Sequence, residues 1–127
     1  MTLKVVKCPC KNKTLHRKLE DGNGFVSDGI FSLAQGRYFL NRLRNGGHMT
    51  DTEFAAADEE LLAAGLPEFA EYEEGELMGA ALQIATSSPI AAAAGEIDRI
   101  LERGMISPAD AERLRTMVAA FAERIAQ

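Results

Sequence analysis

Apolar and polar residues alternate in two short stretches near the start of the chain, and this spacing predicts β-strands. Residues 3–7 are rich in β-branched side chains, and residues 14–19 place two leucines on one face. The sequence Asp-Gly-Asn-Gly at residues 21–24 then favours a tight turn, because Gly and Asn accept the positive φ that such turns need. Residues 25–31 are expected to return as a third strand. The pattern predicts a small antiparallel sheet or β-hairpin arm.

From Ser32 onward the apolar spacing changes to the period of about 3.6 residues that is typical of helices. The first helix is expected to end at residues 45–47, Asn-Gly-Gly, since glycine commonly ends helices. Thr50 and Glu53 form a capping-box pattern, in which each side chain accepts a backbone N–H of the other residue. A second helix is therefore predicted over residues 51–64.

Three further helices are predicted after an acidic loop at residues 68–76. The third covers residues 77–86, and Ser-Ser-Pro at residues 87–89 opens the fourth, because serine caps helices and proline fits their first turn. Gly104 ends the fourth helix, whose expected apolar face is Ile90, Ala94, Ile97, Ile100 and Leu101. Ser107 and Pro108 open the last helix, whose expected apolar stripe is Ala111, Leu114, Val118, Phe121 and Ile125.

These elements predict a mainly α fold of about five helices with a small N-terminal β-hairpin or extended basic arm. The length of 127 residues, 46% of them apolar, suffices for one domain with a real core. We place the arm at residues 1–31. Residues 32–127 then form an acidic helical body with two similar helix-turn-helix hairpins.

An internal repeat supports the two hairpins. Residues 40–53 align without gaps, at an offset of 57, with residues 97–110: each has a helix end, a glycine, an apolar residue, a hydroxyl cap and an acid three residues later. Either a duplication or the shared requirements of tight helical hairpins explains this repeat. The pattern resembles, over a few dozen residues, the hairpins of SHOCT-type oligomerisation modules. Gly-His-Met at residues 47–49 also looks like a cloning junction, but the repeat crosses it, which favours a continuous chain.

Charge is divided along the sequence. Residues 1–48 contain nine basic and three acidic residues, a net charge of +6, whereas residues 49–127 contain five arginines and sixteen acidic residues, a net charge of −11. Such asymmetry favours assembly, with opposite charges meeting between neighbouring copies, over catalysis.

The sequence predicts a cytoplasmic protein that does not span a membrane. The longest apolar stretch, near residues 89–94, is much shorter than the roughly 20 residues that a bilayer requires. The first residues have charges where a signal peptide would need an apolar segment. Cys8 and Cys10 are too close together for a typical disulfide framework, so reduced thiols are expected.

Cys8, Cys10 and His16 form the pattern C-x-C-x5-H, which is the one candidate metal site of the sequence. Structural zinc has four ligands, usually supplied by C-x2-C pairs, and no second cysteine pair exists here. We therefore predict no metal cofactor. If zinc binds, a carboxylate or a second subunit would have to complete the site. The alternative is two inert thiols beside a surface histidine.

No set of catalytic groups can be assembled from the sequence, so we predict a protein that is not an enzyme. Two charged clusters are instead candidate interaction sites. A basic N-terminal ribbon could contact nucleic-acid phosphates or another subunit, and it comprises Lys4, Lys7, Lys11, Lys13, Arg17 and Lys18. An acidic stretch, which is expected to be a solvated loop, comprises Glu71, Glu73, Glu74 and Glu76.

The favoured function is a structural or adaptor subunit of a larger homo-oligomeric assembly, such as a phage virion connector, collar or capsid-stabilising protein. A basic arm and an acidic body on one chain would attract each other between copies. The competing hypothesis is a small regulator or inhibitor that binds one macromolecule, either as an acidic mimic of nucleic acid or as a DNA binder that uses the basic arm.

Overall fold

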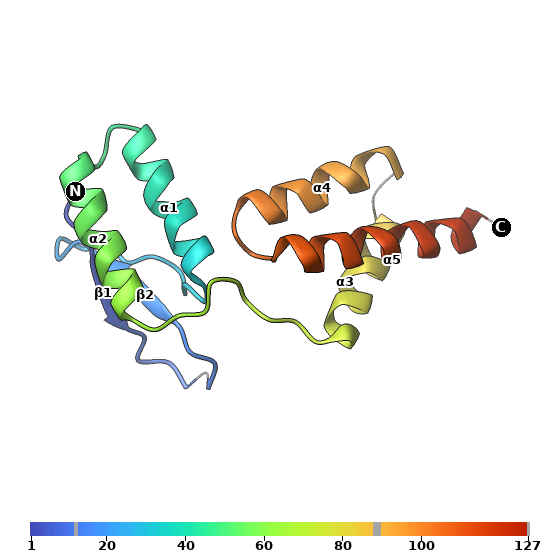
Figure 1. Ribbon diagram of the computed structural model, residues 1–127, viewed down its shortest axis with the longest axis horizontal. Helices are drawn as coiled ribbons and strands as arrows, with labels where there is room; N and C mark the ends of the chain where they lie inside the picture. Colours follow the sequence, from blue (N-terminus) through green and yellow to red (C-terminus); the bar gives the residue numbers. More distant parts are fainter. Residues whose placement is uncertain (12, 88–89, 127) are drawn as a thin grey trace. The chain divides into compact units, whose positions relative to one another are not determined.

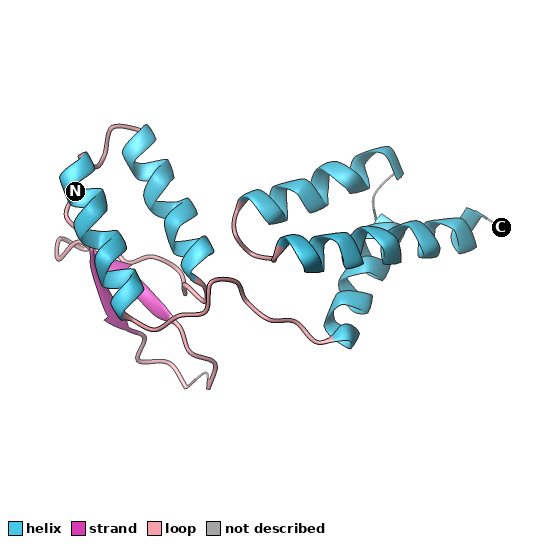
Figure 2. Ribbon diagram, in the orientation of Figure 1, coloured by secondary structure: helices cyan, strands magenta, loops and turns pink. Residues whose placement is uncertain are grey.

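The computed structural model describes residues 1–11, 13–87 and 90–126, and within them the chain forms two compact units, Met1–Ala70 and Glu71–Gln127 (Figure 1). Five helices and one two-stranded sheet form among the described residues, which confirms the mainly α fold with a small N-terminal β-hairpin (Figure 2). The boundary expected between residues 31 and 32 falls inside the first unit. The strand segment therefore belongs with the first two helices.

The sheet of the first unit pairs β1 (Lys4–Lys7) with β2 (Arg17–Glu20) in antiparallel register, with Val5 opposite Leu19 and Lys7 opposite Arg17. The first strand lies within its predicted stretch, whereas β2 starts three residues later and ends one residue later than the predicted stretch of residues 14–19. The connection between them is residues 8–16, a segment that contains both cysteines.

The third strand expected at residues 25–31 does not form as a regular strand. The segment runs beside β2 and meets it at two isolated bridges, Glu20 with Val26 and Arg17 with Ile30. These bridges are out of register by one residue, as at a β-bulge. Between them the Ser27 hydroxyl accepts the Leu19 N–H at 2.9 Å and so takes the place of a backbone carbonyl. A side-chain acceptor of this kind interrupts the strand ladder.

Helices α1 (Leu33–Asn45) and α2 (Asp51–Ala63) form a hairpin, of which α2 packs against β1 (Figure 1). Ser32 caps α1 by accepting the Gln35 N–H, and Thr50 and Glu53 form the predicted capping box at the start of α2. Both helices agree with the sequence prediction to within one residue.

One buried cluster joins the strand segment to this hairpin. Leu19, Leu40 and Leu61 are each 0% exposed, although they come from β2, α1 and α2 respectively. Gly36 of α1 allows the helices to approach, because a Cβ there would lie 2.8 Å from a methyl carbon of Leu61. The complete set of buried apolar residues is Leu3, Leu19, Ile30, Leu40, Met49, Ala57 and Leu61.

The second unit consists of α3 (Glu74–Ser87), α4 (Ile90–Glu102) and α5 (Pro108–Ala126). Helix α3 begins three residues before the predicted start, so the predicted acidic loop is too long. Carboxylates near the first N–H groups of a helix are stabilising, and α3 has Glu74 and Glu76 in its first turn. Most of the predicted opening of the fourth helix lies outside the described residues.

The buried faces of the second unit agree in part with the prediction. On α4, Ile97 is buried as expected, but Ala93 is buried in place of Ala94. The predicted stripe on α5 holds as far as Val118, whereas Ile125 is 55% exposed near the end of the helix. The largest buried apolar cluster of this unit consists of Leu77, Ala81, Ile84, Ala93, Ile97, Ile106, Ala111, Leu114 and Val118, and Ala122 is also buried.

The internal repeat corresponds to one turn geometry that occurs once in each unit. Gly47 and Gly104 both have positive φ, 79° and 70°, which favours glycine. The residue after each glycine donates its N–H to the equivalent helix carbonyl, at 2.9 Å from His48 to Leu43 O and at 3.2 Å from Met105 to Ile100 O.

The next positions of the repeat also match. Met49 and Ile106 are both buried, at 5% and 3% exposure. The hydroxyl that follows each of them caps the next helix, and the distance to the accepted N–H is 3.1 Å both for Thr50 and for Ser107. Burial of Met49 within this turn agrees with a continuous chain.

Removal of either capping hydroxyl should destabilise its own unit to a similar extent. We expect Thr50→Ala and Ser107→Ala each to lower the free energy of unfolding by about 1 kcal/mol, because one N–H at the helix start loses its acceptor. Urea denaturation followed by circular dichroism measures this loss. Thr52→Ala, at an exposed position of the same turn as Thr50, is the control and should change little. Equal effects of Thr50→Ala and Thr52→Ala would contradict the capping role.

Candidate functional site

Cys8, Cys10 and His16 lie together at the end of the β-hairpin. One ligand atom from each, the two Sγ atoms and a ring nitrogen, lies within 4.8 Å of the other two. Cys10 Sγ is 2.9 Å from His16 Nε2. The strands explain this placement: Cys8 directly follows β1 and His16 directly precedes β2, so that the register of Lys7 opposite Arg17, continued by one residue, sets Cys8 opposite His16.

The ring of His16 is held in one orientation. Its Nδ1 is 2.7 Å from the carbonyl oxygen of Thr14, and because a carbonyl can only accept, Nδ1 carries the hydrogen. In the neutral ring Nε2 then presents its lone pair toward Cys10. The ring also stacks on Phe31, with centroids 4.9 Å apart, and the residue is only 8% exposed. The alternative interpretation of the sequence had this histidine on the surface, whereas the structure shows that it is buried.

The surroundings of the cluster favour a thiolate at Cys8. Hydrogen bonds from the side chain and backbone of Cys10, followed by one from His16, lower the pKa of Cys8 to about 7, and the charge of Lys18 adds to this effect. The pKa of His16 is raised, first by its bond to the Thr14 carbonyl and then by Cys8. When the ring of His16 is neutral and its Nε2 lone pair is available, the two sulfur atoms and this imidazole are soft ligands that suit zinc.

The six basic residues of the predicted ribbon do not lie on one face. Residues opposite each other across antiparallel strands share a face, and successive residues alternate. Lys7 and Arg17 therefore share the face of the buried Leu19, whereas Lys4 and Lys18 lie on the opposite face. Lys11 and Lys13 belong to the connecting segment. The arrangement does not favour a continuous phosphate-binding track.

The four acidic residues from Glu71 to Glu76 lie at the start of α3 and are all exposed. Glu76 accepts the backbone N–H of Glu73 at 3.2 Å, which is the bond by which a residue of the first turn caps its own helix. Their position thus has a structural explanation in helix capping and in the helix dipole.

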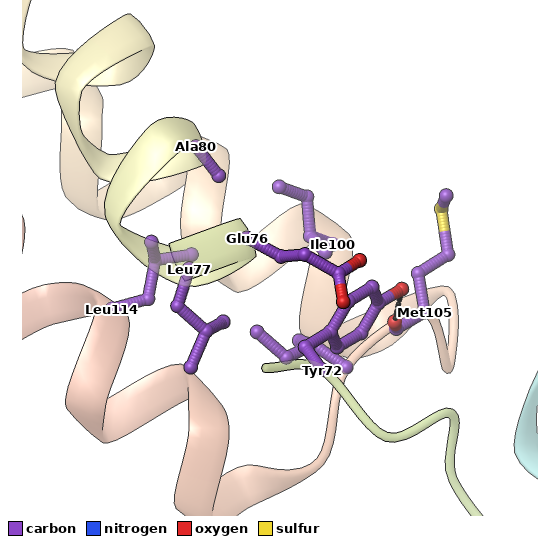
Figure 3. A pocket seen from close by; sticks show the side chains of 8 residues that line it. Tyr72, Glu76, Leu77, Ala80, Ile100, Met105 and Leu114 are labelled. Carbon is purple, nitrogen blue, oxygen red and sulfur yellow. Dashed lines mark hydrogen bonds between the residues drawn. The ribbon is translucent and has the colours of Figure 1, made fainter. Parts of the chain in front are cut away.

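An apolar pocket of about 290 Å³ lies in the second unit, between the start of α3 and the turn from α4 to α5 (Figure 3). The Tyr72 hydroxyl donates to the carbonyl of Met105 at 2.7 Å along one side of it. Burial, and then the charges of Glu76 and Asp110, raise the pKa of Tyr72, so the hydroxyl stays protonated. The other lining residues are aliphatic except Glu76, so the pocket suits an apolar side chain better than a polar substrate.

A further surface feature was missed in the sequence reasoning. The outer face of α3, defined here as Gly75, Met78, Gly79, Leu82 and Thr86, repeats at spacings of three and four residues and carries no charge. Met78 and Leu82 are 46% and 48% exposed. The sequence signal was present, since the 19 residues from Leu77 to Gly95 contain no charged side chain.

Charge is distributed differently over the units than along the chain. Residues 1–70 contain nine basic and nine acidic residues, a net charge of zero, and residues 71–127 contain five basic and ten acidic residues, a net charge of −5. Arg37 of α1 binds Asp58 of α2 through two hydrogen bonds of 2.7 and 3.2 Å. Part of the charge asymmetry is therefore compensated inside the first unit.

Comparison with protein-family models, with curated proteins and with solved structures found no match to this chain. The resemblance to SHOCT-type hairpins thus rests on the repeated pattern itself. Among the described residues, no helix is both long and apolar enough to cross a bilayer.

The environment of Cys8 predicts the pH dependence of its alkylation. In chelator-washed protein, the rate of reaction of Cys8 with iodoacetamide should rise with a midpoint near its pKa of about 7, because the thiolate is the nucleophile. Site-resolved mass spectrometry across a pH series measures it. Lys18→Gln should raise the midpoint slightly. A midpoint for the unmodified chain at about pH 8.5, the usual thiol value, would contradict the described environment.

Proposed function

We propose that this chain is a non-enzymatic subunit of a homo-oligomeric assembly and that copies associate through the outer face of α3. The observation that carries the proposal is the combination of exposure and absence of charge on that face. Surface helices normally present charged or polar residues outward, and a helix that is apolar all round is usually buried. Helix α3 is apolar on its inner face through Leu77, Ala81 and Ile84, and it is uncharged on its outer face as well.

The two glycines on this face support a close helix contact. Gly75 and Gly79 lie within α3, where glycine costs up to about 1 kcal/mol relative to alanine. Among the described residues, no heavy atom outside the immediate neighbourhood lies within 4 Å of the position that a Cβ would take at either glycine. Packing inside the unit therefore does not require them. Close approach by the backbone of a second helix would require these glycines, since the absence of a side chain lets two helices meet at short distance.

A second copy is the occupant that the charges favour. The second unit has a net charge of −5, so contact between two copies is opposed over most of its surface. The outer face of α3 carries no charge that would repel an identical face, and symmetric dimers bring the same patch of both chains together. Association through this face removes Met78 and Leu82 from water.

The remaining features agree with a role in binding and not in catalysis. The apolar pocket is lined by one carboxylate and by a tyrosine hydroxyl that already donates to a carbonyl. The basic residues are split between two faces of the hairpin, so the structure lends no support to DNA binding as the main activity.

Gly79→Ala tests the proposal because its two expected effects have opposite signs. The methyl group should raise the free energy of unfolding of the monomer by up to about 1 kcal/mol through better helix propensity. It should also weaken self-association about tenfold, because crowding in a packed contact costs about 1–3 kcal/mol. Sedimentation velocity over a concentration series gives the dissociation constant, and urea denaturation of dilute protein gives the stability.

Gly95→Ala is the matched control. Gly95 lies within α4 and is equally open at the position of a Cβ among the described residues, so its replacement should stabilise the monomer by a similar amount without changing the dissociation constant. Leu82→Gln should weaken association while leaving stability nearly unchanged. Equal association of the unmodified chain, Gly79→Ala and Leu82→Gln would contradict the proposal.

A further inference from the structure

We propose that Cys8, Cys10 and His16 bind one zinc ion through both sulfur atoms and through His16 Nε2. The three ligand atoms lie within 4.8 Å of one another, so small side-chain rotations bring them to the zinc distances of about 2.3 Å from sulfur and about 2.0 Å from nitrogen. The site is separate from the outer face of α3, so either proposal can fail without the other.

The sheet positions two of the three ligands before any metal binds. Cys8 and His16 occupy opposite positions at the end of the paired strands, and the short C-x-C spacing brings Cys10 back toward them. A metal site on paired strands loses less conformational entropy on binding than one on an open loop. Zinc knuckles usually bring two cysteines together by a C-x2-C spacing, whereas here the paired strands and the C-x-C spacing together bring the ligands close.

His16 Nδ1 donates its hydrogen to the Thr14 carbonyl, and histidines that bind a metal through one ring nitrogen usually donate from the other nitrogen in this way. Such a partner fixes which nitrogen carries the hydrogen and directs the other nitrogen to the metal. Stacking on Phe31 restricts the ring further. The second nitrogen, Nε2, faces Cys10 at 2.9 Å, so the ring is already directed toward the sulfur atoms that would share the ion.

The donors select zinc over harder cations. Thiolate and imidazole suit zinc, whereas calcium and magnesium prefer oxygen ligands. Two thiolates balance the charge of the ion, and the nearby Lys18 favours the thiolate form. Among the described residues this cluster contains three protein donors, so the fourth position of the tetrahedron is left to water in the isolated chain.

Metal loading of the full chain tests the site. Reduced, chelator-washed protein is mixed with excess zinc, desalted and analysed for metal, and cobalt titration then follows the thiolate-to-cobalt absorption. We expect about one zinc per chain and a cobalt spectrum with thiolate charge-transfer bands. Cys10→Ser, at an exposed position, should lower zinc affinity about 100-fold or more, since loss of even an outer partner costs 10- to 100-fold. Cys8→Ser should do the same.

His48→Gln is the control, because His48 is the other histidine of the chain and is not part of the cluster. This variant should keep one zinc and the cobalt bands. Circular dichroism of Cys8→Ser and Cys10→Ser confirms that the helices are retained, so a loss of zinc reports on the ligands. Zinc below about a tenth of an equivalent in the unmodified chain would overturn the proposal. Unchanged zinc binding after replacement of both cysteines would also overturn the proposal. A disulfide between Cys8 and Cys10 that persists after treatment with reductant would overturn it as well.

Discussion

The tight helical hairpin is the element on which both units depend. Its turn requires a glycine at positive φ, an apolar residue directed into the core and a hydroxyl that caps the next helix, and these positions recur from Gly47 to Thr50 and from Gly104 to Ser107. Two helices joined in this way still have an apolar face that they cannot bury alone. The first unit covers that face with the strand segment and the second covers it with α3. The two units therefore differ in surface mainly through the element that packs on the hairpin, which is the strand segment in the first unit and α3 in the second.

This division changes the meaning of the charges. Along the sequence, a basic segment precedes an acidic one, which suggested attraction between copies. In the fold, the basic α1 packs against the acidic α2, and Arg37 and Asp58 form an ion pair within the unit. The first unit contains as many basic as acidic residues and carries no net charge. Self-association then depends on the uncharged surface of α3, so hydrophobic burial replaces electrostatic attraction as the proposed driving force.

Local rules predicted the fold well where the signal lies within a few neighbouring residues. Caps and helix ends identified α1, α2 and the start of α5, because hydroxyl and glycine positions act over one turn. On α4 the sequence predicted burial of Ala94, but Ala93 is buried instead. Several consecutive alanines do not show which of them faces the core, because all have the same side chain. The irregular segment at residues 25–31 was predicted as a strand because the acceptor role of the Ser27 hydroxyl is visible only in three dimensions.

The candidate sites depended on information that spacing alone does not contain. Proximity of Cys8 and His16 follows from the register of two strands, and the spacing of seven residues between them in the sequence does not specify that register. The basic residues also separate onto two faces, because side chains at neighbouring strand positions point in opposite directions. The outer face of α3, in contrast, was detectable as an uncharged run whose helical spacing leaves one side without a partner.

The dependence of self-association on salt tests the central claim most directly. Light scattering of the unmodified chain over a concentration series, at low salt and at about 1 M salt where charges are screened beyond roughly 3 Å, measures its mass under both conditions. Association through an uncharged face predicts an oligomer that persists or tightens at high salt. A strict monomer under both conditions, or an oligomer that dissociates as salt rises, would contradict this account.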